Sequence, residues 1–326
     1  MPTSHPAWLD RRRLLQAGTG WLVLSGLVGC HDDTPPLRLG SIAFAGYEPI
    51  FLAREQGWLD ERRVRLVELH SNTDTLRALA AGRLEAAQTT LDEFLTARAG
   101  GIDLRVIAVL DISVGADMVI ARPGLREPNR VAGRRVAAEE SAAGAVMLAA
   151  FLRAYELTPA DIVKVTVPLA DGPHAMRDAE ADFIVSAEPW ASQMLAAGGT
   201  NVFDSRAIPD RIVDVMVARA DAFEAHQKAL SAIVAAHFRA LAFIQAQPER
   251  AAAIMAPRLQ LPPDQVPGAF KGLQQPDAND SRELLAPDGQ LLRQVKTLEG
   301  LMVEDGLIRA WSDNSTFFDT RFHPQP

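Results

Sequence analysis

The chain has 326 residues, with 33 Lys and Arg against 41 Asp and Glu, and its formal net charge is −8. An acidic chain is poorly suited to bind nucleic acid, so nucleic acid is excluded as an expected partner. Hydrophobic residues make up 48% of the chain, enough for substantial cores, and the length suggests two domains.

Residues 1–29 have the pattern of an export signal. Three arginines, Arg11, Arg12 and Arg13, precede an uncharged, largely apolar run that ends at Cys30, the only cysteine in the chain. The end of this run, "LVGC", resembles the lipobox of bacterial lipoproteins, in which the signal is cut before the cysteine and the thiol is acylated. The lipobox therefore predicts lipidation of Cys30. Because two acyl chains already give stable anchoring, we expect a protein held on the periplasmic side of the cell membrane.

The export route and the kind of anchor stay open at this point. The stretch "RRRLLQ" also resembles the twin-arginine signal, so export of the folded chain and export by the general pathway are both possible. A plain secretory signal or a short transmembrane anchor is the alternative to a lipoprotein signal, although a bilayer needs about twenty apolar residues. Residues 30–36, "CHDDTPP", are polar and contain prolines, which predicts a flexible linker.

From residue 37 onward, β-like runs alternate with amphipathic helical runs. Strands are predicted at 37–44, 64–69 and 84–89, with helices at 47–59 and 74–82 between them. This alternation is typical of βαβ units around a mainly parallel sheet and predicts an α/β fold.

The middle of the chain continues the alternation and then changes character. Strands are predicted at 104–112 and 116–122, as neighbours, and at 134–139, 162–168 and 181–188, with a helix at 141–157. The stretches 106–121 and 211–221 look like two crossings between domains, and the pattern is helical after 221. We therefore predict a first lobe of residues 37–110 plus 220–326 and a second lobe of residues 111–219.

The motifs of the common enzyme classes are missing from the sequence. There is no GxxxxGK, GxGxxG, HExxH or GxSxG pattern, and no second cysteine for a thiolate metal site. No catalytic residue, cofactor or metal site is therefore predicted.

Polar residues follow several of the predicted strands, where open α/β sheets bind small ligands. Each of them alone is more often an ordinary cap or loop residue, but the ends of several strands converge on one cleft. One of these residues, Ser141, opens a helix whose free N–H groups could hold an anion. The residues are Thr89, Thr90, Asp111, Ser113, Glu139, Ser141, Glu188 and Trp190.

Five segments together carry a resemblance to a known family. They are "GSIAFAGYEPIFLAREQGWLDERRVRLVEL", "LAAGRLEAAQTT", "VAGRRVAAEESAAGAVMLAAFL", "ADFIVSAEPW" and "IVDVMVARADAFEAH". Their order and spacing, from about residue 37 to 322, resemble the nitrate/taurine/aliphatic-sulfonate family of substrate-binding proteins of ABC importers. The most specific piece is "EPW" at 188–190, although many relatives carry Trp or Val where this chain has Ser186 and Ala187.

The resemblance implies a two-lobed periplasmic binding protein fold of type II, with two crossing strands and a helical C-terminus. It also implies a small-molecule ligand between the lobes and an ABC permease that senses lobe closure; we expect a monomer. Carried over to this chain, the ligand-binding residues are Phe44, Tyr47, Glu48, Thr89 and Thr90 in the first lobe, Glu139, Ser141, Ala142, Glu188 and Trp190 in the second, and Asp111, Ser113 and Asp214 near the hinge.

The acidic candidates indicate the chemistry of the ligand. Buried carboxylates without cationic partners are costly, so we expect an amine or another strong donor, stacked on Trp190, and not nitrate. An anionic end could bind the N–H groups at Ser141 and Ala142, which would suit a taurine-like zwitterion; an aminopyrimidine related to the thiamine precursor is the alternative. The acids could instead face solvent or pair with Arg54, Arg134 or Arg135.

Two other functions stay open. The resemblance extends to the fungal synthase that makes the thiamine pyrimidine, an enzyme associated with iron and a cysteine-rich motif. This chain has no cysteine beyond Cys30, which speaks against that activity. A sensor that presents its ligand to a membrane receptor is the third candidate.

Overall fold

Two mixed β-sheets, one per lobe, organise the chain after Pro36. The computed structural model describes residues 1, 34–125, 127, 129–310 and 317–324, so the predicted signal and Cys30 lie outside the described residues. Residues 36–326 form one compact unit by their contacts. The two-lobed α/β fold expected from the sequence is confirmed.

The larger sheet has the strand order β11-β4-β10-β3-β1-β2. Strand β1 runs parallel to β2 and β3, whereas β10 runs antiparallel between β3 and β4. The sheet is therefore mixed, and not mainly parallel as the alternation predicted. Its strands are β1 (Leu37–Ser41), β2 (Val64–Glu68), β3 (Ala86–Thr90), β4 (Leu104–Ser113), β10 (Val213–Arg219) and β11 (Leu273–Gln274).

The smaller sheet has the order β7-β6-β8-β5-β9. Strand β6 is parallel to β7 and β8, and β5 is antiparallel to β8 and β9. The prediction that β4 and β5 are neighbours was wrong, because they lie in different sheets. The strands of the smaller sheet are β5 (Met118–Ala121), β6 (Arg135–Ala138), β7 (Val163–Thr166), β8 (Phe183–Ser186) and β9 (Thr200–Asp204).

The chain crosses between the sheets twice, after β4 and after β9. The second lobe was predicted to cover 111–219, but the ladders of β10 with β3 and β4 place residues 213–219 in the larger sheet. The two crossings touch each other, because the hydroxyls of Ser113 and Ser205 are 2.8 Å apart and the Ser205 hydroxyl accepts from Gly115 N at 2.6 Å. Close packing continues at Gly272 (φ +87°), where a Cβ would lie 2.7 Å from Ala116 N.

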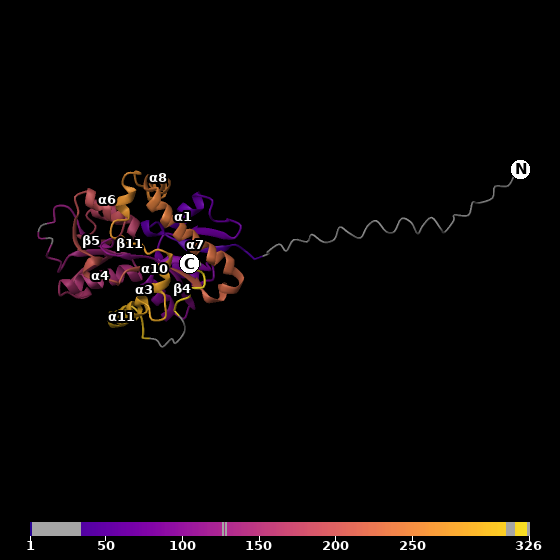
Figure 1. Cartoon of the computed structure of the whole chain (residues 1–326). Coiled ribbons are helices and arrows are strands. Elements are labelled where there is room, and N and C mark those ends of the chain that lie inside the picture. Colours follow the sequence, from indigo (N-terminus) through magenta and orange to yellow (C-terminus); the bar gives the residue numbers. More distant parts are fainter. Residues whose placement is uncertain (2–33, 126, 128, 311–316, 325–326) are drawn as a thin grey trace. The chain divides into compact units, whose positions relative to one another are not determined.

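Helices cover both faces of the larger sheet. The inner residues of β10 alternate, so that Val215 and Val217 pack in the cluster that holds α3 and α11, and Met216 and Ala218 pack in the cluster that holds α1, α7 and α8. Figure 1 shows these two helix layers above and below the sheet. The helices are α1 (Glu48–Glu55), α2 (Asn72–Ala80), α3 (Leu91–Ala99), α4 (Ala142–Ala154), α5 (Gly172–Arg177), α6 (Trp190–Ala196), α7 (Phe223–Ala246), α8 (Pro248–Leu259), α9 (Val266–Ala269), α10 (Ala278–Leu284) and α11 (Gln290–Glu304), with short 3-10 turns at 45–47, 159–161, 169–171, 205–207 and 220–222.

Helix α7 with its preceding turn, residues 220–246, is the one helix in the described part of the chain that is long and apolar enough to cross a membrane. Half of its most apolar stretch is buried. Leu230, Ile233 and Val234 pack in the core of the larger lobe, against α1. We therefore assign α7 as a core helix.

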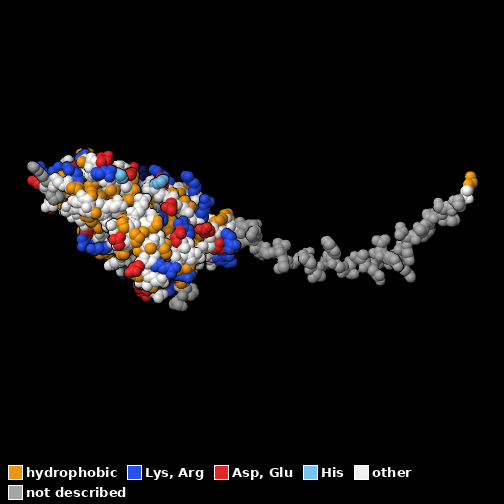
Figure 2. All heavy atoms as spheres, turned by 90° about the horizontal axis from the view of Figure 1, so that it is seen from above, with side chains coloured by type: hydrophobic (Ala, Val, Ile, Leu, Met, Phe, Trp, Pro, Cys, Tyr) orange, Lys and Arg blue, Asp and Glu red, His pale blue; other side chains and the backbone are white. Residues whose placement is uncertain are grey.

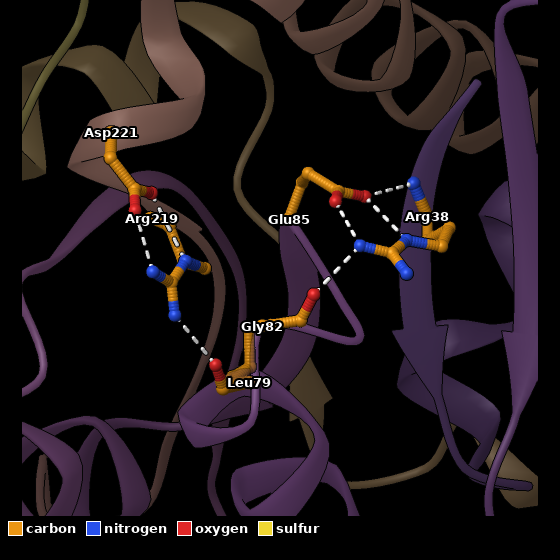
Figure 3. A network of polar contacts seen from close by, with 6 residues as sticks. All are labelled: Arg38, Leu79, Gly82, Glu85, Arg219 and Asp221. Carbon is orange, nitrogen blue, oxygen red and sulfur yellow. Dashed lines mark hydrogen bonds and ion pairs between the residues drawn. The ribbon is translucent and has the colours of Figure 1, made fainter. Parts of the chain in front are cut away.

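Two arginine networks hold the end of the larger sheet that lies away from Thr90 (Figure 3). Arg38 of β1 binds the Glu85 carboxylate, with 3.0 Å from Nε to Oε2, and donates to the Gly82 carbonyl at 2.8 Å. Arg219 of β10 binds Asp221 and donates to the Leu79 carbonyl at 2.8 Å. Both arginines thus bind carbonyls in or just after the last turn of α2, where cations are favoured.

A third arginine, Arg258, binds the segment between β1 and α1. Arg258 of α8 pairs with Glu48, whose side chain is 1% exposed, and donates to the Ile42 carbonyl at 3.1 Å. Its guanidinium carbon lies 3.4 Å from the centroid of the Phe51 ring. Helix α8 therefore holds residues 42–48 in place.

We predict that Arg258→Met lowers the free energy of unfolding by about 3 kcal/mol, because Glu48 would stay buried and lose its cation. Urea denaturation measures the change. Adding Glu48→Gln should recover part of the loss. Arg62→Met is the control, since Arg62 pairs with Asp60 on the surface and should change the value by less than about 1 kcal/mol. Equal losses for Arg258 and Arg62 would contradict this account.

Candidate functional site

A cavity of about 40 Å³ lies between the two lobes. The larger lobe contributes the segment after β1, the end of β3 and the start of β10, and the smaller lobe contributes the segment after β6, the first turns of α4 and the end of β8. The lining residues are Ile42, Phe44, Tyr47, Asn72, Thr90, Asp117, Glu139, Ser141, Ala143, Gly144, Met147, Leu169, Val185, Ser186, Ala187, Ile212 and Asp214.

Six of the predicted ligand-binding residues line this cavity and seven do not. The six come from both lobes and from the start of β10: Phe44, Tyr47, Thr90, Glu139, Ser141 and Asp214. The seven that are not among the lining residues are Glu48, Thr89, Asp111, Ser113, Ala142, Glu188 and Trp190.

Three of those seven have side chains that bind other partners. Glu48 is held by Arg258, and Ser113 bonds Ser205 at the crossing. Glu188 accepts from Ser192, at 3.2 Å from its backbone N–H and 2.8 Å from its hydroxyl, so it caps the first turn of α6. The "EPW" stretch therefore begins a helix, and Trp190 is its first residue.

Several lining residues were not predicted from the sequence. Asp117 lies in the short crossing before β5, and Asn72 is the first residue of α2. Both positions follow from topology, because the crossings and the helix starts of a two-lobed fold face the cleft. The apolar members, such as Met147 and Leu169, carry no chemical signal in the sequence that sets them apart from core residues.

The cleft collects buried carboxyl groups. Burial raises the pKa of Glu93 to about 8 and that of Asp92 and Asp117 to about 6. Burial also raises the pKa of Asp111 and of its neighbour across the ladder, Asp214, and the charge on Asp111 adds to the shift at Asp214. Among the described lining residues there is no lysine or arginine.

Three acceptors of the lining residues have no partner among the described residues. Asn72 Oδ1, Asp117 Oδ2 and Glu139 Oε2 are buried and unpaired. By contrast, Asp214 accepts from the Tyr47 hydroxyl. Because a buried acceptor without a donor costs about 1–3 kcal/mol, these oxygens favour a guest that brings N–H or O–H groups.

The lobes touch at the beginning of α4. Thr73 of the larger lobe donates its hydroxyl to the Glu140 carbonyl at 2.5 Å, and Ala142 N donates to Glu93 Oε1 at 2.6 Å. One water needs about 10–15 Å³, so the cavity has room for only a few. An organic solute therefore needs the lobes to separate before it can enter.

Comparisons with known proteins agree with this geometry. A family model described as the NMT1-like family matches residues 31–258. A search of curated proteins gives no match.

Among solved structures, the periplasmic aliphatic sulphonate binding protein SsuA from Escherichia coli is 19% identical with a TM-score of 0.69, covering 85% of this chain and 94% of that one. The alkanesulfonate-binding protein SsuA from Xanthomonas axonopodis pv. citri, bound to MOPS, is 16% identical with a TM-score of 0.67, covering 84% and 94%. The periplasmic nitrate-binding protein NrtA from Synechocystis PCC 6803 is 15% identical with a TM-score of 0.60, covering 84% and 89%. These likenesses establish the fold.

We predict that the free energy of unfolding falls by roughly 2 kcal/mol or more between pH 5 and pH 8. The raised pKa values of Asp92, Glu93 and Asp117 mean that the folded chain binds protons more tightly than the unfolded chain. Their stabilising effect is complete below the ordinary pKa near 4 and is lost as the pH rises through 6 to 8. Urea denaturation at constant ionic strength measures the slope.

Two variants separate this effect from surface charge. Asp92→Asn with Glu93→Gln should flatten the slope. Asp182→Asn should leave it unchanged above pH 5, because the arginines beside Asp182 lower its pKa and its effect falls in the acid range. Burial lowers the pKa of His237 and His323, so these two groups act in the opposite direction over the same range in every variant. Equal slopes in the unmodified chain and in the Asp92→Asn, Glu93→Gln variant would rule out the protonated cluster.

Proposed function

Because the chain belongs to the NMT1-like family, we propose that it is the solute-binding component of an ABC importer. It captures a small polar organic molecule between its two lobes and presents it to a permease in the cell membrane. The observation that carries the proposal is the cavity itself, since residues from both lobes line it and several of its acceptors are unpaired. Closure around a guest would satisfy these acceptors and join the lobes.

The acidic residues of the cavity indicate the chemical class of the ligand. Glu139, Asp117 and Asp214 line it without a cationic residue beside them, so an amine or a donor-rich ring would be favoured. Phe44 and Tyr47, in edge-to-face contact at 5.0 Å, provide the aromatic wall that the sequence assigned to Trp190. Amine-bearing molecules of the taurine kind and aminopyrimidines related to the thiamine precursor both meet this requirement in part.

The location follows from the sequence. "LVGC" supports cleavage before Cys30, a lipid on its thiol and attachment on the periplasmic side of the membrane. Acidic and basic side chains are interspersed on the face of the molecule shown in Figure 2, which therefore lacks the broad basic patch typical of nucleic-acid binding. The proposed protein is a monomer, and its proposed partner is an ABC permease.

An enzyme of the thiamine-pyrimidine synthase type has less support. Its chemistry depends on cysteines and a histidine, whereas Cys30 is the only cysteine here and no histidine is among the described residues that line the cavity. A sensor would use the same cleft, and its partner would be a receptor instead of a permease.

Mass spectrometry of the protein purified under native conditions tests the function without a guess about the solute. We expect one small nitrogen-containing molecule to co-purify and to be released by acid, because protons compete with it for the carboxylates. Calorimetry with ethanolamine, taurine, 4-aminopyrimidine and nitrate then ranks the classes. Tight binding of nitrate with no response to amines would overturn the acidic-pocket proposal.

We predict that Glu139→Gln weakens binding of the co-purified solute about tenfold or more, since a hydrogen bond donated to a charged acceptor contributes about 1.5–3 kcal/mol. Calorimetry measures the dissociation constant. Glu304→Gln removes one negative charge from the exposed side of α11 and should leave the constant unchanged. The same loss in both variants would mean that net charge, and not contact, attracts the solute.

A further inference from the structure

The amino end of α4 has the features of an anion-binding position. The helix has 13 residues, its N-cap is Ser141, and Ser141, Ala143 and Gly144 all line the cavity. Unpaired N–H groups and the helix dipole make such an end attractive to a negatively charged group. A guest with a sulfonate or carboxylate would be expected to place it here.

In this protein the position is already filled by a side chain. Glu93 Oε1 accepts from Ala142 N at 2.6 Å, and the hydroxyl of Ser141 accepts from Gly144 N at 3.1 Å. Glu93 is 1% exposed, so its carboxyl group is enclosed and not merely near the helix. It belongs to α3 in the other lobe, and it reaches across the cleft to make this bond.

The local sequence explains why Glu93 is free to do so. It is the third residue of α3, where a glutamate usually turns back to bond the N–H of its own N-cap residue. Here the N-cap is Thr90, whose hydroxyl bonds Asp92, and Asp92 also accepts from Glu93 N at 2.7 Å. Asp92 thus takes over the local capping, and the Glu93 carboxyl group points to α4.

An anionic guest would meet two obstacles at this position. It would have to displace Glu93 from the N–H group of Ala142, and it would then lie among the remaining carboxyl groups. Burial, with the nearby charges of Asp92 and Glu139, raises the pKa of Glu93. Asp92, whose pKa is about 6, is largely ionised at pH 7 and repels a second negative charge, and such repulsion is strong where water is excluded.

We propose that Glu93 is a specificity-determining residue, whose carboxyl group fills the anion position at the start of α4 and restricts the cleft to solutes without a negatively charged group. This inference rests on the proposed function and narrows it. It favours a simple amine or an aminopyrimidine over a taurine-like zwitterion. Glu93 acts as a permanent substitute for the acidic end that such a solute would carry.

The test is binding of ethanesulfonate, which carries a sulfonate and no amine, measured by calorimetry at pH 7. Glu93→Ala removes the competing carboxyl group, and we expect it to bind ethanesulfonate about tenfold more tightly than the original chain. Glu93→Gln keeps the shape and the acceptor oxygen that binds Ala142 N, so we expect a smaller gain. Thr73→Val removes a different bond between the lobes, from the Thr73 hydroxyl to the Glu140 carbonyl, and should give no gain.

The possible results distinguish failure of this inference from failure of the proposed function. Ethanesulfonate binding that is as tight in the original chain as in Glu93→Ala overturns the inference and leaves the proposed function standing. No gain in a folded Glu93→Ala, judged by its circular dichroism, overturns it as well. If the alanine variant does not fold, Glu93→Ser is measured against the same two criteria. Failure of any solute to co-purify counts against the proposed function alone, because the ethanesulfonate comparison does not depend on it.

Discussion

Carboxyl groups buried where the two lobes meet, with no cationic side chain among the described lining residues, are the constraint on which the site depends. Strand β10 brings several of these carboxyl groups together, because it runs antiparallel between β3 and β4. In this position Asp214 lies beside Asp111 in the ladder and accepts a hydrogen bond from the Tyr47 hydroxyl. Such a cluster persists only if protons, donors or a guest compensate for the lost hydration. The stability, the pH response and the selectivity of the protein therefore have one common origin.

Contacts elsewhere in the larger lobe hold the segments that carry this cluster in position. Arg258 fixes the segment that carries Phe44 and Tyr47, and the networks of Arg38 and Arg219 fix the far end of β1, β3 and β10. In these places charges are paired or bonded to carbonyls. Ion pairing is thus used in the scaffold and is absent from the cavity wall, which is the distribution expected of a site that leaves its acceptors for a ligand.

Periodicity and strand ends predicted the alternating elements and three of the lining residues, and the family resemblance added Phe44, Tyr47 and Asp214. The other expectations failed for identifiable reasons. Thr90, Glu139 and Ser141 could be found because polar residues after apolar strands converge in an α/β fold. Glu93 could not, because a third-position glutamate normally serves its own helix. Glu48 was misassigned because its partner, Arg258, is 210 residues away. The predicted pairing of β4 with β5 failed because the chain changes sheets between two apolar strands, and nothing in their composition records the change.

The contact between the two crossings, Ser113 to Ser205, has a mechanical consequence. Two independent connections would let the lobes slide and twist as well as bend apart, whereas two connections bonded to each other act as one hinge. The loop at Gly272 packs directly against the first crossing, since a Cβ there would lie 2.7 Å from Ala116 N. We therefore expect one lobe to move against the other mainly by rotation about this hinge.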